Sequence, residues 1–147
     1  MFWNVVKACL KIGWKFIKSK FEKKAERAKT GVVYKVLHPI YAAVPFFAGV
    51  DKYFNFITDW EQYASPLAVR ATGLSPKTLM RIAGVAEMFI GAMIVVKPRL
   101  GLAMSASMYA GIIGNLLTMP KQLHLVSLDA TLMVTALMLI LLVPGNA

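Results

Sequence analysis

Four stretches of about 19 to 23 mostly apolar residues follow one another along this 147-residue chain and constrain its fold more than any other feature. A helix rises ~1.5 Å per residue, so each stretch is long enough to cross a hydrocarbon core of ~30 Å. The stretches are continuous and lack the alternation of a lipid-facing barrel strand, which leaves helices as the spanning element. The sequence therefore predicts an all-α membrane protein, a four-transmembrane-helix bundle with spans at about 34–56, 77–96, 100–119 and 125–143.

The reactive side chains argue against a self-contained enzyme. Cys9 is the single cysteine, so an internal disulfide and a thiol oxidoreductase with its own cysteine pair are both excluded. His38 and His124 are expected near opposite ends of the bundle, too far apart to share a metal ion or a haem. No nucleotide-binding or hydrolase motif occurs. We therefore expect no metal site and no cofactor of the chain's own, and a catalytic role would need a cofactor from a partner.

The first 35 residues carry ten Lys and Arg against two Glu. Apolar and basic side chains recur there at three- and four-residue spacing on separate faces, a pattern that predicts a basic amphipathic helix over residues 1–30, lying in the membrane interface before a membrane domain at 31–147. The expected contacts with anionic lipid headgroups are Trp3, Lys7, Lys11, Trp14, Lys15 and Lys18.

Other readings of this segment fit less well. An organellar transit peptide stays open, although the Lys bias and the single Ser argue against it. Lysines interrupt every candidate apolar core of a secretory signal. A basic face interleaved with Trp, Ile and Phe suits anionic lipid better than nucleic acid, so no nucleic-acid partner is expected.

The basic residues also predict an orientation. The N-terminal segment and the Lys97/Arg99 turn fall on one side, and the positive-inside rule places both termini in the cytoplasm or its organellar equivalent, in a bacterial or mitochondrial inner membrane. Residues 59–76 are expected as a polar, aromatic loop on the outer side. Pro39 and Pro45 lie inside the first span and predict a kink or a broken first turn.

Polar residues interrupt all four spans at a similar depth. Counted along each helix at ~1.5 Å per residue, they lie ~6–8 Å inside the outer boundary. Their charges sum to zero, so we expect an intramembrane polar network that fixes helix register, with Lys52 also able to extend to the surface. Its expected members are Asp51, Lys52, Arg81, Asn115 and Asp129.

Glu87 lies deeper than these residues and is the leading candidate for binding a ligand or a proton. It follows Arg81 by six residues, so it faces another part of the helix surface, and no acid or base is expected at its depth. Either it is protonated, because loss of water disfavours the charged form, or it receives a polar or cationic group from elsewhere.

Small residues repeat along the third span and predict close packing against another helix, within this chain or in another subunit. Gly84 and Gly91 on the second span invite the same interpretation. The residues of the third-span stripe are Ala106, Ser107, Ala110, Gly111 and Gly114.

The stretch Arg81-Ile-Ala-Gly-Val-Ala-Glu87-Met-Phe-Ile-Gly91-Ala, followed by Val96-Lys97-Pro98-Arg99, resembles the second and third spans of the DoxX-like membrane proteins. Ala48-Gly49-Val50-Asp51-Lys52 resembles the end of that family's first span. The resemblance covers about residues 40 to 143 and implies a four-helix architecture. It also implies a partner role, because members are associated with quinone-linked and other membrane oxidoreductase complexes and with assembly functions. The basic extension and Asp129 depart from the family pattern.

Two functional hypotheses follow. The first is a non-catalytic accessory or assembly subunit of a larger membrane complex, respiratory or redox-linked, whose partners are other membrane protein subunits. The second is a small transport or quinone- or lipid-binding protein that uses Glu87 and the outer polar cluster. A catalytic membrane enzyme that borrows its cofactor is a weaker third option.

Overall fold

The computed structural model describes residues 31–144, and no strand occurs in this range. The chain divides into two compact units, Met1–Lys35 and Val36–Ala147. The packing described below is that of the second unit. The interfacial helix predicted for residues 1–30, with its Trp and Lys side chains, lies outside the described residues.

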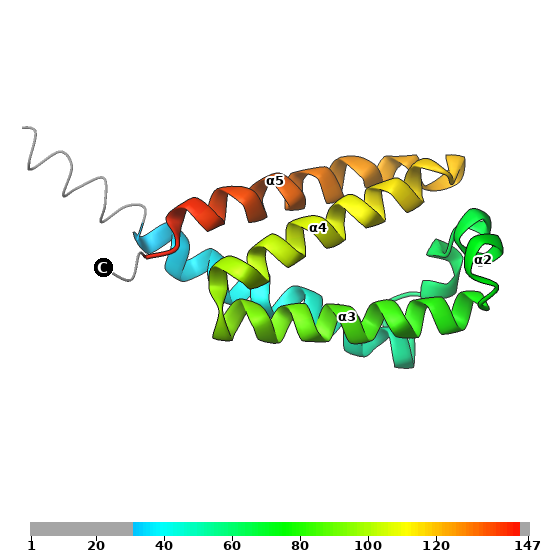
Figure 1. Ribbon diagram of the computed structural model, residues 1–147, viewed down its shortest axis with the longest axis horizontal. Coiled ribbons are helices and arrows are strands. Elements are labelled where there is room, and N and C mark those ends of the chain that lie inside the picture. Colours follow the sequence, from blue (N-terminus) through cyan, green and yellow to red (C-terminus); the bar gives the residue numbers. More distant parts are fainter. Residues whose placement is uncertain (1–30, 145–147) are drawn as a thin grey trace, which may run out of the picture. The chain divides into compact units, whose positions relative to one another are not determined.

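Four helices of the described range are long and apolar enough to cross a membrane (Figure 1). The first is Gly31–Phe54, and the second and third are α3 (Pro76–Val96) and α4 (Pro98–Leu117). The fourth, Pro120–Leu142, joins the 3-10 helix η2 (Pro120–Leu125) to α5 (Val126–Leu142). The predicted all-α four-helix architecture is confirmed, and the chain is an integral, multi-pass membrane protein.

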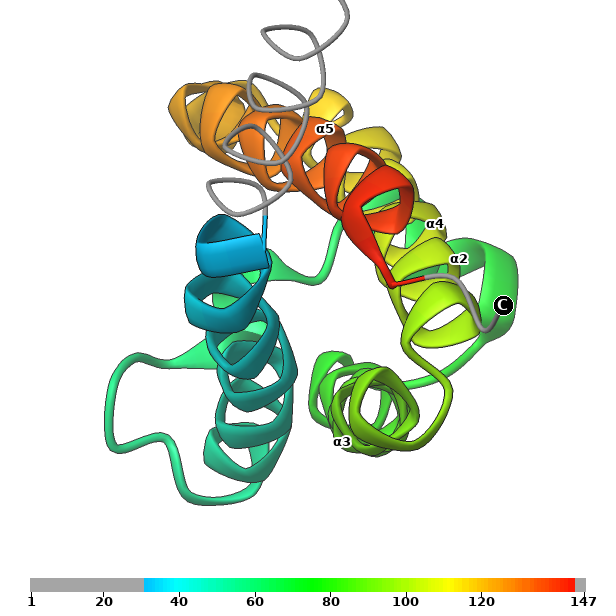
Figure 2. The same cartoon turned by 90° about the vertical axis from the view of Figure 1, so that its left-hand side faces the viewer.

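The four helices of the second unit form a closed ring of neighbours (Figure 2). The first helix contacts α3, where the Nε2 atom of His38 lies 2.9 Å from the carbonyl oxygen of Ile94. α3 packs on α4, and α4 packs on α5. The ring closes where the hydroxyl of Tyr41 donates a 3.0 Å hydrogen bond to the carbonyl of Leu132 in α5.

The outer faces of these helices are apolar. Large aliphatic and aromatic side chains are exposed along all four, as expected where lipid replaces water as the solvent. Examples are Phe47, Phe89, Val95, Val96 and Leu141.

Proline and serine set the helix boundaries. α3 begins with Pro76 after Ser75, whose side chain accepts a hydrogen bond from the Thr78 amide, a standard N-cap. α4 and η2 also begin with proline, at Pro98 and Pro120. The first helix, in contrast, is continuous through its two internal prolines, so the broken turn expected there does not occur.

The connection between the first helix and α3 is more ordered than the expected loop. It contains the 3-10 helix η1 (Trp60–Tyr63) and the helix α2 (Pro66–Thr72). Ser65 caps α2 by accepting a hydrogen bond from the Ala68 amide. Gly73 ends α2 in the left-handed conformation, at φ 70°, which glycine adopts without steric cost. We call the end of the bundle that carries η1 and α2 the loop end.

Glycines let the first helix and α3 approach until their backbones touch. A Cβ atom placed on Gly84 would lie 2.7 Å from the carbonyl oxygen of Gly49, and one on Gly91 would lie 2.6 Å from that of Ala42. Gly49 meets the Gly84 carbonyl in the same way. Close approach through small residues is a common basis of helix association in membranes, and here it joins two helices of one chain.

The predicted stripe on α4 has no comparable neighbour. Ala106 is buried, but Ser107, Ala110, Gly111 and Gly114 are exposed. A Cβ atom on Gly111 or Gly114 would meet nothing within 4 Å among the described residues. The exposed part of the stripe therefore does not pack against another described helix of this chain, and the alternative that the sequence leaves open, a partner outside the chain, stays a prediction.

We expect Gly84→Ala to destabilise the bundle, because the new methyl group would clash with the backbone of the first helix. Overpacking of this kind costs about 1–3 kcal/mol. Gly114→Ala, on an open helix face, should leave the unfolding free energy unchanged or raise it by up to ~1 kcal/mol. Thermal unfolding in detergent measures both. An equal unfolding free energy of the two variants would contradict the close contact between the two backbones at Gly84.

Candidate ligand-binding cavity

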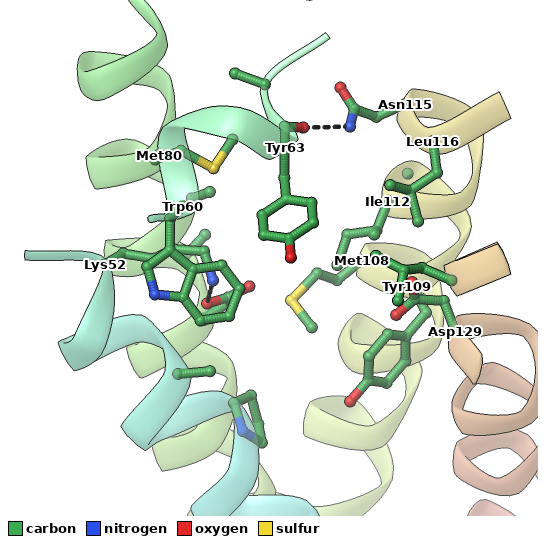
Figure 3. Close-up of a pocket in the computed structure, with 18 of the residues that line it drawn as sticks. Lys52, Trp60, Tyr63, Met80, Met108, Tyr109, Ile112, Asn115, Leu116 and Asp129 are labelled. Carbon is green, nitrogen blue, oxygen red and sulfur yellow. Dashed lines mark hydrogen bonds and ion pairs between the residues drawn. The ribbon is translucent and has the colours of Figure 1, made fainter. Parts of the chain in front are cut away.

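A partly open cavity of about 620 Å³ lies between the four helices at the loop end. Its walls come from the first helix, α3, α4 and α5, and residues of η1 and of the segment that follows it line it as well (Figure 3). Most of the lining is apolar. The residues of the lining that carry a formal charge are Lys52, Glu87 and Asp129.

Lys52 and Glu87 form a buried ion pair in the wall of this cavity. The Nζ atom of Lys52 lies 2.6 Å from Oε2 of Glu87, and the two side chains are 5% and 8% exposed. The geometry corrects two expectations. Lys52 does not extend to the surface, and Glu87 is not without a partner in the chain. The close contact at Gly84, whose added Cβ would lie 3.2 Å from the Cβ of Lys52, brings the lysine stem to α3.

Trp60 covers the ammonium group of this pair. The Nζ atom of Lys52 lies 3.7 Å from the centre of an indole ring of Trp60, a cation–π contact. The indole Nε1 atom donates a 2.7 Å hydrogen bond to the carboxylate of Asp51. The same carboxylate accepts hydrogen bonds from the amides of Phe56 and Ile57. Asp51 therefore terminates the first helix and holds the aromatic side chain that shields Lys52.

Asn115 attaches the connection to α4. Its Nδ2 atom donates a 2.7 Å hydrogen bond to the carbonyl of Tyr63, and its Oδ1 atom accepts a 3.1 Å bond from the amide of Ser65. Both backbone groups lie where η1 passes into α2. In consequence the ring of Tyr63 points into the space between the helices, as Figure 3 shows.

Arg81 lies apart from the cavity. Its side chain is exposed, and its guanidinium carbon lies 5.8 Å from the ring centre of Tyr53. The hydroxyl of Tyr53 also donates a hydrogen bond to the backbone carbonyl of Arg81. These contacts join the first helix to α3 on the outside of the bundle.

Asp129 is the third charged residue of the cavity. It is half-buried in the first turn of α5, and its carboxylate makes no hydrogen bond or ion pair with any residue between 31 and 144. Tyr109 is buried in the facing wall of α4. The sequence did not single out Tyr109, although it shares a helix face with Ile112 and Leu116 at three- and four-residue spacing.

The five-residue network predicted from helix depth does not form. Asp51 bonds to its own loop, Asn115 bonds to the backbone near η1, and Arg81 faces outward. Lys52 pairs with Glu87 instead. Asp129 alone of the predicted set faces the cavity without a partner among the described residues.

The cavity combines apolar walls with a few polar and charged side chains. Apolar walls with a few convergent polar groups are typical of small-molecule sites. No group of three or more potential metal-ligating side chains lies together within residues 31–144.

We expect Lys52→Met to destabilise the protein, because it leaves the Glu87 carboxylate buried without its cation. Breaking a buried pair from one side costs about 3–5 kcal/mol. The double variant Lys52→Met/Glu87→Met should recover most of this loss, since neither member of the pair then leaves an unpaired buried charge. The unfolding free energies of the two single variants and of the double variant form a double-mutant cycle. If the losses of the two single variants add up to the loss of the double variant, the two residues are not coupled.

We expect Asn115→Ala to loosen the connection while the bundle stays folded. The buried Ser65 amide would lose its acceptor, at a cost of about 1–3 kcal/mol. Amide hydrogen exchange should quicken over residues 58–65. Ser107→Ala, an exposed change on the same helix, is the control, and unchanged exchange in the Asn115 variant would refute the anchoring role.

Comparison with protein-family models, with curated proteins and with solved structures finds no match to this chain, so the resemblance to the DoxX-like family stays a prediction.

Proposed function

We propose that this protein binds an amphipathic small molecule of the lipid or quinone class in the cavity at the loop end of its helix bundle. The observation that carries the proposal is the cavity itself, about 620 Å³ between apolar helix walls. This volume falls within the ~300–1,000 Å³ typical of ligand sites. The preferred function is thus the second of the two suggested by the sequence.

The distribution of polarity supports an amphipathic ligand. Val44, Leu79, Ile112 and Leu132 supply apolar wall from four different helices, while Lys52, Glu87 and Asp129 supply charge. A purely apolar molecule would leave the Asp129 carboxylate without a partner, and a fully polar one would lose water against the apolar walls. A molecule with an apolar body and one polar group satisfies both.

The accessory-subunit hypothesis is the second candidate, and the exposed small-residue face of α4 favours it. Ser107, Ala110, Gly111 and Gly114 form a smooth surface on which a helix of another protein could pack closely. A respiratory or redox-linked partner is what the DoxX-like resemblance implies. Native extraction in mild detergent tests this proposal, because it predicts recovery within a larger complex.

The distribution of Lys and Arg supports a cytoplasmic or equivalent organellar location for both termini, in a bacterial or mitochondrial inner membrane. The loop end and its cavity would then face the opposite side.

We expect Gly111→Phe to block ligand binding. Gly111 borders the cavity, and its Cβ direction is free of contacts within 4 Å, so an aromatic ring can enter without disturbing the helices. A decyl-substituted quinone or a short-chain phospholipid is added to the protein in micelles, and bound probe is measured by native mass spectrometry. The wild type should retain one molecule. The variant should retain at least ~10-fold less, which corresponds to a loss of about 1.4 kcal/mol in binding free energy.

Gly114→Phe is the matched control. Gly114 has equally open surroundings one helical turn away, and it does not border the cavity. It should retain the ligand. Equal retention by both variants, or no retention by the wild type for either probe, would overturn the binding proposal.

A further inference from the structure

We infer that the cavity selects an amphipathic organic cation, a protonated amine or quaternary ammonium group on an apolar body, with Asp129 as its counter-ion. This inference rests on the proposed ligand-binding function and names the chemical class of the ligand.

The first step is the charge of the cavity wall. Lys52, Glu87 and Asp129 are the lining residues that carry a formal charge. With all three charged, their formal sum is one negative charge. A cation would bring the occupied cavity to neutrality, whereas an anion would double its excess charge. Charge imbalance is costly in a membrane interior, where water does not screen it.

The second step is that Lys52 already has partners. Its ammonium group contacts Glu87 at 2.6 Å and the face of Trp60 at 3.7 Å. An anionic ligand would have to compete with Glu87 for this group. Because Lys52 and Glu87 are paired, Asp129 is the charged group of the cavity that is available to pair with a ligand.

The third step is the position of Asp129 itself. Its carboxylate makes no hydrogen bond or ion pair with any residue of the described range. The first turn of α5 and a bound cation both favour the carboxylate form of this side chain. Occupation by a cation thus stabilises the charge that the free cavity leaves uncompensated.

Aromatic rings complete the cation site. Tyr63 and Tyr109 line the cavity, and Figure 3 shows their rings beside the same space as Asp129. The faces of such rings attract ammonium groups and suit quaternary ammonium in particular. Leu128 and Leu132 on the same helix as Asp129 supply apolar wall for the remainder of the ligand.

The test compares probes that share one decyl chain. Decyltrimethylammonium, 1-decanol and decyl sulfate are titrated separately against the full-length protein, and bound probe is measured by native mass spectrometry. We expect decyltrimethylammonium to bind on the order of tenfold more tightly than 1-decanol, the factor that ~1.4 kcal/mol provides. Decylphosphocholine serves as a fourth probe, and Asp129-dependent binding of it would identify a choline headgroup as the source of the cation.

Three variants separate charge from structure. Asp129→Asn should remove the preference for decyltrimethylammonium and leave 1-decanol binding unchanged, while Asp129→Glu should retain the preference. Asp59→Asn is the matched control, because it removes the same charge from an exposed residue outside the cavity lining, and Asn still caps η1.

The outcomes are distinct. Equal binding of the cation and the alcohol, or an unaltered preference in Asp129→Asn, would overturn the cation inference and leave the ligand-binding proposal intact. Tightest binding of decyl sulfate would overturn it in favour of Lys52 as the headgroup site. If the wild type retained neither the quinone nor the phospholipid probe, the proposed function itself would fail.

Discussion

The buried ion pair between Lys52 and Glu87 is the interaction on which the rest of the bundle depends. Either charge alone would be costly inside a membrane, so the two must meet, and they can meet only if the first helix and α3 approach closely. Gly49 and Gly84 make that approach possible because neither has a side chain to keep the two backbones apart. The pair thereby fixes the register of the two helices with more specificity than apolar packing supplies in lipid.

The order of the loop end follows from the same pair. An ammonium group in a wide cavity would attract water unless something covered it, and Trp60 covers it. Asp51, one residue before Lys52 in the sequence, holds Trp60 by its indole nitrogen. Lys52 and Asp51 thus face different directions from one helix, Lys52 toward α3 and Asp51 toward the connection. Asn115 fastens the far side of that connection to α4.

The sequence predicts the helices of this protein well, because span length and hydropathy depend on local composition alone. It predicts the polar contacts poorly. The depth of a residue along a helix axis does not show which way its side chain faces or how far a lysine side chain reaches. The depth argument therefore places Asp51 and Lys52 in one network and leaves Glu87 without a partner. Ser65 followed by Pro66 is a typical start of a helix, and this pair indicates α2 within the expected loop.

The position of α4 links the two proposed functions. Tyr109 and Asn115 on its inner face line the cavity, and Asn115 also binds the connection that follows the first helix. Gly111 borders the cavity and also belongs to the exposed small-residue face. A partner helix packed on that face would form a neighbouring surface beside the cavity. Any effect of the partner on ligand affinity would then appear as an equal effect of the ligand on partner affinity, because binding free energies are reciprocal. Ligand binding and assembly are for that reason compatible roles of one bundle, and a difference in affinity between the free and assembled protein would measure the coupling between them.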